Sequence, residues 1–589
     1  MKSSAAVKYF VWFVLSILAA GSCVGYAWRD DSLALLGLFG LGVFLSAQLH
    51  YRNLLVVFAH SLLTGYLTFL IANGWMHWTI DGLGDLPAAR VVAIVHGIHL
   101  FHGGLWCLFA VSWWFMRRFI RSGWILAPAL WLIVESLYPA MFPVRQGCLL
   151  GTVQPLIQIA AIFGVAGVTL QAVLLAGLIP LGCFALGKTK FGTQSLDSSE
   201  VTDRTDRDRS VLTTEDCRFG DDTRSKPDNL QVWANPIPRN MARHCFVAVI
   251  LLTAMNYAWG TFRIYQIESA EADFQGDRLD VLLVQGETEY AGFHYKMLDR
   301  TRQQTDCELV LWPECSLGHY RRDLTDFSDE GQVAMKSMGI GYQFQPMPDP
   351  HCYLLGGGYS WTQSTETEER KKSSNYVSAY LIDLQQKMVG RHDKIELMVG
   401  GECLPGDQYF PELAKWLYTG EPAVDESQEN NAGEVVNLSR GTIAQPVGKV
   451  HGMSVAVVLC CEDMYPWLSR EMVNQGADLL VCLANGMSFN TEVALWQHFN
   501  IARFRAIENN RYFLRCGSYG VSGLISPTGK LLYTVPCFEE ADLKVAIPIE
   551  HREVAIFTRF GDSLTWASYA MVFGFAVVTL IPWRRERCG

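Results

Sequence analysis

Long apolar stretches near both ends of the chain constrain its fold more than any other feature of the sequence. A helix of about 20 apolar residues crosses the hydrocarbon core of a bilayer. Six such stretches occur before residue 187, and two more flank a long polar region. The eight predicted spans are Tyr9–Trp28, Leu33–Leu49, Leu54–Trp75, Val91–Phe115, Trp124–Phe142, Ile157–Leu186, Cys245–Phe262 and Leu564–Trp583. The chain is therefore predicted to be a polytopic α-helical membrane protein with about eight spans.

The distribution of Lys and Arg predicts how these spans are oriented, because cytoplasmic flanks carry most of these residues. Basic residues precede the first span, separate the fourth from the fifth, and follow the eighth. They are Lys2, Lys8, Arg117, Arg118, Arg121, Arg584, Arg585 and Arg587. With eight spans, all of these positions lie on one side of the membrane. Both termini are then cytoplasmic, and residues 265–562 lie outside the cytoplasm.

The composition changes between the sixth and the seventh span. Residues 187–243 contain runs of mixed charge with few apolar residues, and such a segment cannot bury a core. The predicted organisation is six spans in residues 1–186, a disordered cytoplasmic loop in 187–243, span seven in 244–264, an extracytoplasmic domain in 265–562, and span eight with a cytoplasmic tail in 563–589. We assign no function to the loop.

The predicted extracytoplasmic domain alternates short apolar runs with helical stretches. Strands are expected at Asp280–Gly286, Leu309–Leu311, His351–Gly356, Val377–Asp383, Ser454–Leu459, Ala477–Ala484, Tyr512–Cys516 and Lys530–Thr534. Helices are expected at Phe293–Gln304, Pro466–Gln475 and Glu492–Asn509. This alternation is typical of a layered α/β domain, in which ligand sites form at strand ends.

Three reactive side chains follow predicted strands of this domain. Cys460 follows the apolar run that ends at Leu459, Glu314 closes the run that begins at Leu309, and Lys394 lies in Gly-Arg-His-Asp-Lys. A thiol near a carboxylate and an ammonium is a candidate nucleophile site. Taken alone, Cys460 would more readily be interpreted as a core cysteine, because free cysteines are common in protein interiors.

In this chain order, the three residues resemble the Glu-Lys-Cys triad of the nitrilase, or carbon-nitrogen hydrolase, superfamily. Glu314 stands in Trp-Pro-Glu, Lys394 stands eight residues before Glu402, and Cys460 stands two residues before Glu462. With membrane spans on both sides of the domain, these spacings resemble the apolipoprotein N-acyltransferases. The resemblance implies a four-layer αββα sandwich, with Glu402 and Glu462 holding Lys394 and tuning Glu314.

Later residues extend the resemblance. Asn485 is a further supporting candidate, although Gly486 stands where the family usually has Asp, which leaves the local lining of the acyl pocket open. The predicted helix 492–509 also carries Arg503, Arg505 and Glu508, as the family does. An exposed helix face with ion pairs would show the same residues.

Four residues are candidates for contact with lipid or substrate. Trp416, Leu417 and Tyr418 fit an amphipathic arm above the site, although an ordinary surface helix would have the same pattern. Glu135 lies in the fifth span, where an ionisable residue is a functional candidate unless it reaches the interface. Nearby, Tyr138 stands where the family has Arg.

Neither a metal nor a cofactor is predicted. His96, His99 and His102 share one face of the fourth span, but such histidines more often form contacts between helices. The 16 cysteines include no Cys-x-x-Cys pair, and nine of them lie in residues 265–562. Disulfides are permitted outside the cytoplasm, but their connectivity cannot be read from the sequence.

The three residues permit acyl transfer in two steps, although hydrolysis would pass through the same thioester. Glu314 would take the proton of Cys460 as the sulfur attacks an ester, and Lys394 would stabilise the oxyanion. An amine would then attack the thioester. Cys461 is the rival nucleophile. Because neighbouring strand residues point to opposite faces, only one of the two can meet the base, and the Cys-x-Glu spacing selects Cys460.

The resemblance implies a membrane acyltransferase that moves a fatty acyl chain from a phospholipid to the N-terminal amine of diacylglyceryl-cysteine lipoproteins. It also implies a monomer in the inner membrane of a bacterium, with the catalytic domain on the periplasmic side and no nucleic-acid partner. The alternative is a membrane-tethered carbon-nitrogen hydrolase acting on a small amide, which the eight spans disfavour. A transporter or sensor with a degenerate domain is disfavoured by the intact triad.

Overall fold

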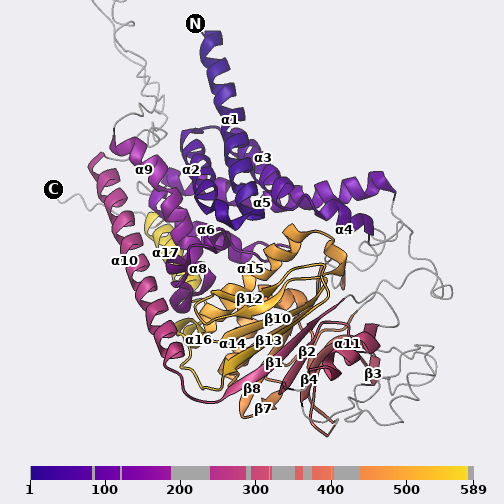
Figure 1. Cartoon of the computed structure of the whole chain (residues 1–589). Helices are drawn as coiled ribbons and strands as arrows, with labels where there is room; N and C mark the ends of the chain where they lie inside the picture. The colour runs from indigo at the N-terminus through magenta and orange to yellow at the C-terminus, as the bar shows by residue number, and fades with distance from the viewer. Residues whose placement is uncertain are drawn as a thin grey trace, which may run out of the picture.

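The molecule consists of a helical bundle and an α/β domain. The computed structural model describes residues 2–82, 87–119, 123–186, 239–286, 293–304, 306–317, 319–321, 352–362, 374–385, 387–399, 401–403 and 438–580. Figure 1 shows the bundle above the α/β domain, with α10 (Arg239–Ala272) running along one side of both. The predictions for residues 187–238 and for Trp416, Leu417 and Tyr418 lie outside the described residues.

The helices of the bundle correspond to the predicted spans. They are α1 (Lys2–Arg29), α2 (Ala34–His50), α3 (Leu54–Ala72), α4 (Met76–Gly82), α5 (Ala88–Phe119), α6 (Ala127–Leu137), α7 (Gln154–Ile157), α8 (Ala160–Ala176), α9 (Leu178–Ala185), α10 and α17 (Ser563–Leu580). Within the described ranges, six helical segments are long and apolar enough to cross a membrane. The fifth and eighth predicted spans correspond to the shorter apolar helices α6 and α17.

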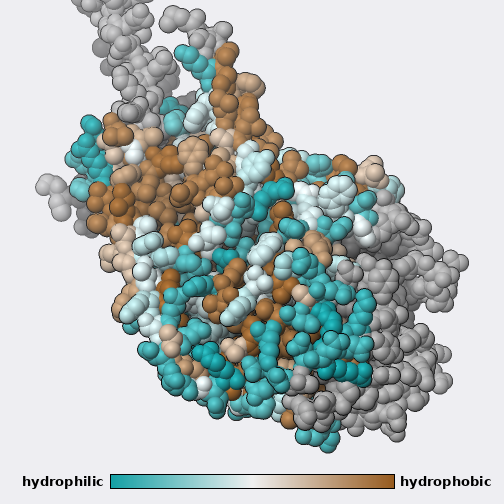
Figure 2. Space-filling view, in the orientation of Figure 1, coloured by the Kyte–Doolittle hydropathy of each residue, from teal (hydrophilic) through white to brown (hydrophobic). Residues whose placement is uncertain are grey.

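Large apolar side chains cover the outside of the bundle, as the brown band in Figure 2 shows. Phe10, Leu35, Leu55, Leu251 and Met255 are each more than half exposed. A soluble protein rarely exposes an apolar surface of this size. This surface is therefore suited to contact with lipid, whereas the teal surface of the α/β domain is suited to water.

Close helix contacts and aromatic side chains fill the inside of the bundle. Gly65 of α3 and Gly103 of α5 face each other so closely that a Cβ at Gly65 would lie 2.8 Å from the Cα of Gly103. Small residues permit this approach between helices in a membrane. Next to this contact, the rings of Phe44, Trp106 and Trp131 pack edge to face, with centroids of neighbouring rings 4.7 and 5.3 Å apart.

Two sheets form the α/β domain. The first has the strand order β13-β1-β2-β4-β5-β6, with β3 beside β4, and the second has the order β12-β11-β10-β9-β8-β7. The strands are β1 (Arg278–Gln285), β2 (Leu309–Trp312), β3 (His319–Arg321), β4 (Tyr353–Thr362), β5 (Ser374–Ile382), β6 (Met388–Asp393), β7 (Gly448–Val450), β8 (Met453–Leu459), β9 (Leu479–Asn485), β10 (Tyr512–Ser518), β11 (Ser522–Ile525), β12 (Leu531–Val535) and β13 (Ala541–Pro548). Because β1, β2 and β4 are parallel, as are β8, β9 and β10, their carboxyl ends lie at one edge of each sheet.

The sheets pack face to face, with helices outside them. Alternate residues of both sheets, among them Leu311 and Val457, form the core between the sheets. The outer helices are α11 (Phe293–Arg302), α14 (Pro466–Asn474), α15 (Glu492–Asn509) and the short α16 (Ile556–Phe560). α11 packs on the first sheet, while α14 and α15 pack on the second. The predicted αββα sandwich is confirmed.

Helix α15 joins the α/β domain to the bundle. The side-chain amide of Gln497 donates hydrogen bonds to the carbonyl oxygens of Trp28 (2.8 Å) and Ala72 (3.0 Å). At the other end of the helix, the carboxylate of Glu508 accepts a hydrogen bond from the backbone N–H of Val165 in α8 (2.8 Å). Helix α15 therefore lies against both the second sheet and the bundle, and Gln158 adds a hydrogen bond to the carbonyl oxygen of Thr528 after β11 (2.8 Å).

Candidate active site

Glu314, Lys394 and Glu402 form a buried group of charges that we call the catalytic cluster. Glu314 lies in the turn after β2, Lys394 directly follows β6, and Glu402 lies in a turn shortly after it. Nζ of Lys394 lies 2.9 Å from Oε1 of Glu314 and 2.6 Å from Oε1 of Glu402. Lys394 is completely buried. The structure thus brings together three of the predicted site residues.

A close approach of β4 fixes the turn that carries Glu314. The backbone N–H of Gly357 donates to the carbonyl oxygen of Pro313 (3.2 Å), and that of Leu317 donates to the carbonyl oxygen of Gly357 (2.7 Å). A Cβ at Gly357 would lie 2.6 Å from the Cα of Glu314. Only glycine permits this contact, so the neighbouring strand helps to position the carboxylate.

Cys460 begins a 3-10 turn, Cys460–Met464, at the carboxyl end of β8. Its φ angle is +46°, a left-handed conformation that is uncommon for a residue with a Cβ and that clusters at functional sites. The expectation that Cys460 and Cys461 point to opposite faces of a strand is therefore wrong, because neither residue belongs to the strand. The turn separates them instead: the Cys461 thiol donates to the carbonyl oxygen of Glu396 (3.3 Å), and the Cys460 sulfur lies 4.0 Å from the carbonyl oxygen of Asn485.

Burial and shared charge set the protonation states in the catalytic cluster. Burial raises the pKa of Glu314, while the charge of Lys394 opposes this rise. Burial lowers the pKa of Lys394, but the two carboxylates outweigh this effect and raise it well above its ordinary value. Burial and the charge of Glu314 raise the pKa of the Cys460 thiol. Cys460 is thus a neutral thiol at rest, close to a carboxylate with increased proton affinity, which is an arrangement for general-base catalysis.

Glu402 and Glu462 support Lys394 in different ways. Glu402 binds the ammonium directly and accepts a hydrogen bond from the backbone N–H of Met398 with its other oxygen (2.8 Å). Glu462 is fully buried and accepts hydrogen bonds from His392 (2.9 Å), from the N–H of Ile395 (2.6 Å) and from the N–H of Leu459 (2.8 Å). Glu462 therefore fixes the backbone on both sides of Lys394 to the end of β8.

Asn485 connects the end of β9 to the catalytic cluster. Its backbone N–H donates a hydrogen bond to Oε2 of Glu314 (3.1 Å). Its side-chain oxygen accepts hydrogen bonds from the hydroxyl of Ser518 (3.0 Å) and the N–H of Met487 (3.0 Å). Asn485 therefore orients the carboxylate of Glu314 through its backbone rather than its side chain.

A second buried group, which we call the anchor cluster, consists of Asp463, His498 and Arg515. The Nε2 of His498 lies 2.8 Å from Oδ1 of Asp463, and Arg515 binds both Oδ2 of Asp463 and Nδ1 of His498. Arg515 Nη2 donates to Nδ1 at 3.0 Å, so the Nε2–H of His498 donates to Asp463. Burial would raise the pKa of Asp463, but His498 and Arg515 hold it below its ordinary range.

The anchor cluster was not predicted from the sequence. The interpretation of helix 492–509 as an exposed face of ion pairs is wrong, because His498, Arg505 and Glu508 are buried. Arg505 binds Glu508 (2.7 Å) and the carbonyl oxygen of Asp463 (3.2 Å). The sequence did carry one signal of this burial. Apolar residues occur around the whole circumference of the helix, which is typical of a helix that is buried on both sides.

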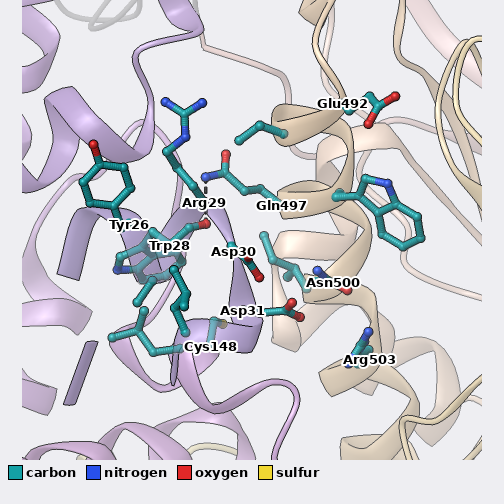
Figure 3. Close-up of a pocket in the computed structure, with 16 residues that line it drawn as sticks. Tyr26, Trp28, Arg29, Asp30, Asp31, Cys148, Glu492, Gln497, Asn500 and Arg503 are labelled. Carbon is teal, nitrogen blue, oxygen red and sulfur yellow. Dashed lines mark hydrogen bonds between the residues drawn. The ribbon is translucent and has the colours of Figure 1, made fainter. Parts of the chain in front are cut away.

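A cavity of about 550 Å³ lies on the other side of α15, between this helix and the end of α1. Figure 3 shows Arg29, Asp30 and Asp31 facing Gln497 and Arg503 across it. The α15 residues that line this cavity lie opposite those that pack against Cys460 and the second sheet. This cavity is therefore separate from the catalytic cluster.

The structure places Glu135, a predicted candidate for contact with lipid or substrate, in a hydrogen-bond network within the protein. Its carboxylate faces the interior of the protein, where Oε1 accepts hydrogen bonds from Trp131 Nε1 (2.9 Å) and from the backbone N–H of Gln146 (2.6 Å), and Oε2 is buried. Glu135 thus holds the chain that follows α6. In the described part of the chain, His96 hydrogen-bonds to Tyr66, and no group of three His, Cys, Asp or Glu residues is arranged to hold a metal.

Two protein families match successive parts of this chain. The model of the carbon-nitrogen hydrolase family matches residues 287–555, which include most of the α/β domain. The model of the apolipoprotein N-acyltransferase N-terminal domain matches residues 20–178, which form most of the bundle.

Curated apolipoprotein N-acyltransferases are similar to the chain. The protein of Geobacter metallireducens is 26% identical over 58% of this chain and 59% of its own length. That of Shewanella oneidensis is 23% identical over 84% of this chain and 82% of its own length. That of Vibrio cholerae is 22% identical over 94% of this chain and 93% of its own length, so the similarity extends over both the bundle and the α/β domain.

Proposed function

This chain belongs to the apolipoprotein N-acyltransferase family, and from this we propose that Glu314, Lys394 and Cys460 transfer a fatty acyl chain from a phospholipid to a lipoprotein. The acceptor is the N-terminal amine of a diacylglyceryl-cysteine lipoprotein. The observation that carries the proposal is the buried ammonium of Lys394 between two carboxylates, next to the turn that holds Cys460.

In the first step, the sulfur of Cys460 attacks the ester carbonyl carbon of the phospholipid while Glu314 takes the thiol proton. The raised pKa of Glu314 favours this transfer, and the raised pKa of Cys460 means that the thiol ionises only as it attacks. Lys394 stabilises the negative charge that develops on the carbonyl oxygen. When the carbon–oxygen bond breaks, Glu314 returns the proton to the lysophospholipid alcohol, and a thioester remains on Cys460.

In the second step, the free amine of the lipoprotein attacks the thioester carbon. Glu314 accepts a proton from the nitrogen, Lys394 again stabilises the oxyanion, and the sulfur leaves as the amide forms. Glu314 returns this proton to the sulfur, which restores both the thiol and the base. Glu402 keeps Lys394 in place throughout, while Glu462 and the backbone of Asn485 hold the cation and the base in position.

We propose that the phospholipid and the lipoprotein both reach the site from the membrane. The contact of α15 with the bundle supports this, because it places the second sheet against the helices whose outer surface is apolar. The clustered basic residues support a position of the enzyme in the inner membrane with the catalytic domain on the periplasmic side. A single chain contains all three proposed catalytic residues, which is sufficient for a monomer.

Acylation of Cys460 is the direct test of this proposal. The purified full-length protein, incubated with phospholipid, should gain the mass of one acyl chain, and hydroxylamine should remove it. Cys460→Ala should prevent this mass shift, whereas Cys461→Ala should retain it, because Cys461 is turned toward the carbonyl of Glu396. Acylation that persists in Cys460→Ala and disappears in Cys461→Ala would assign the reaction to the other cysteine.

A further inference from the structure

Two cysteines lie side by side where the neighbouring strands β2 and β4 begin. The strands are parallel, with Leu309 paired with Tyr353, and the N–H of Tyr353 donates to the carbonyl oxygen of Glu308 (2.8 Å). Cys307 and Cys352 are thus one residue out of register on adjacent strands. Because neighbouring strands are about 4.8 Å apart, this offset is compatible with the Cα separation of a disulfide, about 4.4–6.8 Å.

Both side chains also lie on the same face of the sheet. Cys307 is buried in the cluster under α11, with Val310 and Leu354, and Cys352 packs against the same cluster. The Cys352 thiol is hydrogen-bonded to Cys307, whose sulfur also lies 3.5 Å from the carbonyl oxygen of Gln304. The two side chains therefore lie close together on one face of the sheet.

From this contact and register we propose that Cys307 and Cys352 form a disulfide bond in the mature protein. The inference depends on the proposed position of the α/β domain outside the cytoplasm, where disulfides persist. The nine cysteines of this domain would then contain one bridge, and the others, including Cys460, remain thiols. Because the number of cysteines in the domain is odd, at least one of them has no disulfide partner within it, which agrees with Cys460 as a free nucleophile.

The bond forms by thiol–disulfide exchange with an oxidant that itself carries a reactive disulfide, such as a thiol oxidase or oxidised glutathione. Cys352 is partly exposed, so its sulfur can attack the oxidant and form a mixed disulfide, which releases one thiol of the oxidant. The sulfur of Cys307 then attacks the sulfur of Cys352 and releases the second thiol. Two electrons and two protons pass from the cysteines to the oxidant.

The electrostatic environment favours this pair over the catalytic thiol. The hydrogen bond from Cys352 lowers the pKa of Cys307, although burial opposes this effect. Burial raises the pKa values of Cys460, Cys461 and Cys482. Because the thiolate is the reactive form, this difference favours the attack of Cys307 on the mixed disulfide and disfavours exchange at Cys460, Cys461 and Cys482.

The bridge would stabilise the part of the first sheet that carries the general base. β2 leads from Cys307 to the turn with Glu314, and β4 leads from Cys352 to Gly357, which contacts that turn. A bond between the starts of the two strands limits their relative movement, so the contact between Gly357 and Glu314 is held from one end of the strands.

Peptide mapping under non-reducing conditions tests the inference. Thiols are blocked with N-ethylmaleimide as the cells are opened, and the full-length protein is purified in detergent, digested and analysed by mass spectrometry. The expected product is the Cys307 peptide joined to the Cys352 peptide, two hydrogen masses below their sum, with less than a tenth of either peptide alkylated. Cys352→Ser should make Cys307 fully alkylated, whereas the control Cys537→Ser should keep the bridge.

Alkylation of both Cys307 and Cys352 in the wild-type protein would overturn the inference. The same digest reports on the proposed function separately, because an acyl group on Cys460 is detected as its own hydroxylamine-sensitive peptide. An acylated Cys460 beside two alkylated cysteines would reject the disulfide and keep the transferase. A bridged pair in a protein that cannot be acylated would reject the transferase and keep the disulfide.

Discussion

The catalytic cluster and the anchor cluster lie near the same cysteine, and both contain a buried carboxylate, Glu314 in the first and Asp463 in the second, but the two carboxylates respond in opposite ways. Burial raises the pKa of Glu314 in the catalytic cluster, and Lys394 does not cancel this effect. In the anchor cluster, burial would raise the pKa of Asp463, but His498 and Arg515 lower it below its ordinary value. Both carboxylates are removed from water, but the pKa of Glu314 rises and the pKa of Asp463 falls.

The balance of charge around each carboxylate explains the difference. Glu314 and Glu402 share a single cation, so one negative charge is left over among the three groups. Asp463 alone receives hydrogen bonds from both His498 and Arg515, and its carbonyl receives one from Arg505. A carboxylate that shares its cation can take up and release a proton, whereas one with a cation of its own is a fixed charge. The first cluster is suited to chemistry and the second to holding the turn of Cys460.

Replacing Glu314 with Gln should have the largest effect on chemistry. The amide keeps the size of the side chain but cannot accept the thiol proton, so the rate of Cys460 acylation should fall by about 10²–10⁴-fold. The midpoint of thermal unfolding should change little, because the variant removes a poorly compensated charge. Single-turnover acylation and thermal unfolding in detergent measure the two effects. An acylation rate within a factor of about 3 of wild type would exclude Glu314 as the base.

Replacing Asp463 with Asn should reverse this pattern. Arg515 would keep its buried charge without its main partner, and breaking such a pair costs about 3–5 kcal/mol of stability. The midpoint of thermal unfolding should therefore fall by several degrees, while the correctly folded fraction keeps most of its acylation rate. Glu314→Gln is the matched control in the same assays. A fully stable Asp463→Asn protein that cannot be acylated would show that the anchor cluster takes part in the chemistry.

Replacing Glu402 with Gln should have a smaller effect, seen mainly as a change in pH dependence. The charge of Glu402 raises the pKa of Glu314, so its removal should lower that pKa. Because the base must be deprotonated, the acid limb of the acylation rate should move to lower pH. A pH series of single-turnover rates measures the shift. A shift of the acid limb to higher pH would contradict this expectation. It would mean that Lys394, no longer held by Glu402, stabilises the charged form of Glu314 less, and that this effect on the pKa of Glu314 is larger than the effect of removing the charge of Glu402.

The sequence was sufficient to predict the layers of the fold and to select Glu314, Lys394 and Cys460 as candidates, because both depend on local patterns. Apolar runs of strand length ended close to Glu314 and Cys460, and the spacing to Glu402 and Glu462 carried the resemblance. The left-handed φ of Cys460 could not be predicted, because the strand pattern continues into the turn without a glycine to mark the change.

The contacts of the supporting residues depend on pairing over long distances in the sequence. His392 and Glu462 are 70 residues apart, and Asp463 and Arg515 are 52 apart, so neither pair leaves a local signal. The charged residues of α15 resemble those of an exposed helix, and they are buried only because the bundle covers the second face. The span pattern around Glu135 likewise gave no signal that its carboxylate accepts hydrogen bonds from Trp131 and Gln146.

The fate of the acylated enzyme tests the central claim most directly, because a transferase and a hydrolase both form the thioester on Cys460. The full-length protein is acylated with phospholipid, freed of excess donor in detergent, and followed by mass spectrometry. We expect the acyl group to persist without an acceptor and to leave promptly when a diacylated lipopeptide with a free N-terminal cysteine is added, with the chain recovered as an amide. N-acetylation of the lipopeptide should block this discharge. Loss of the acyl group to water at the same rate with and without lipopeptide would contradict acyl transfer and indicate a hydrolase.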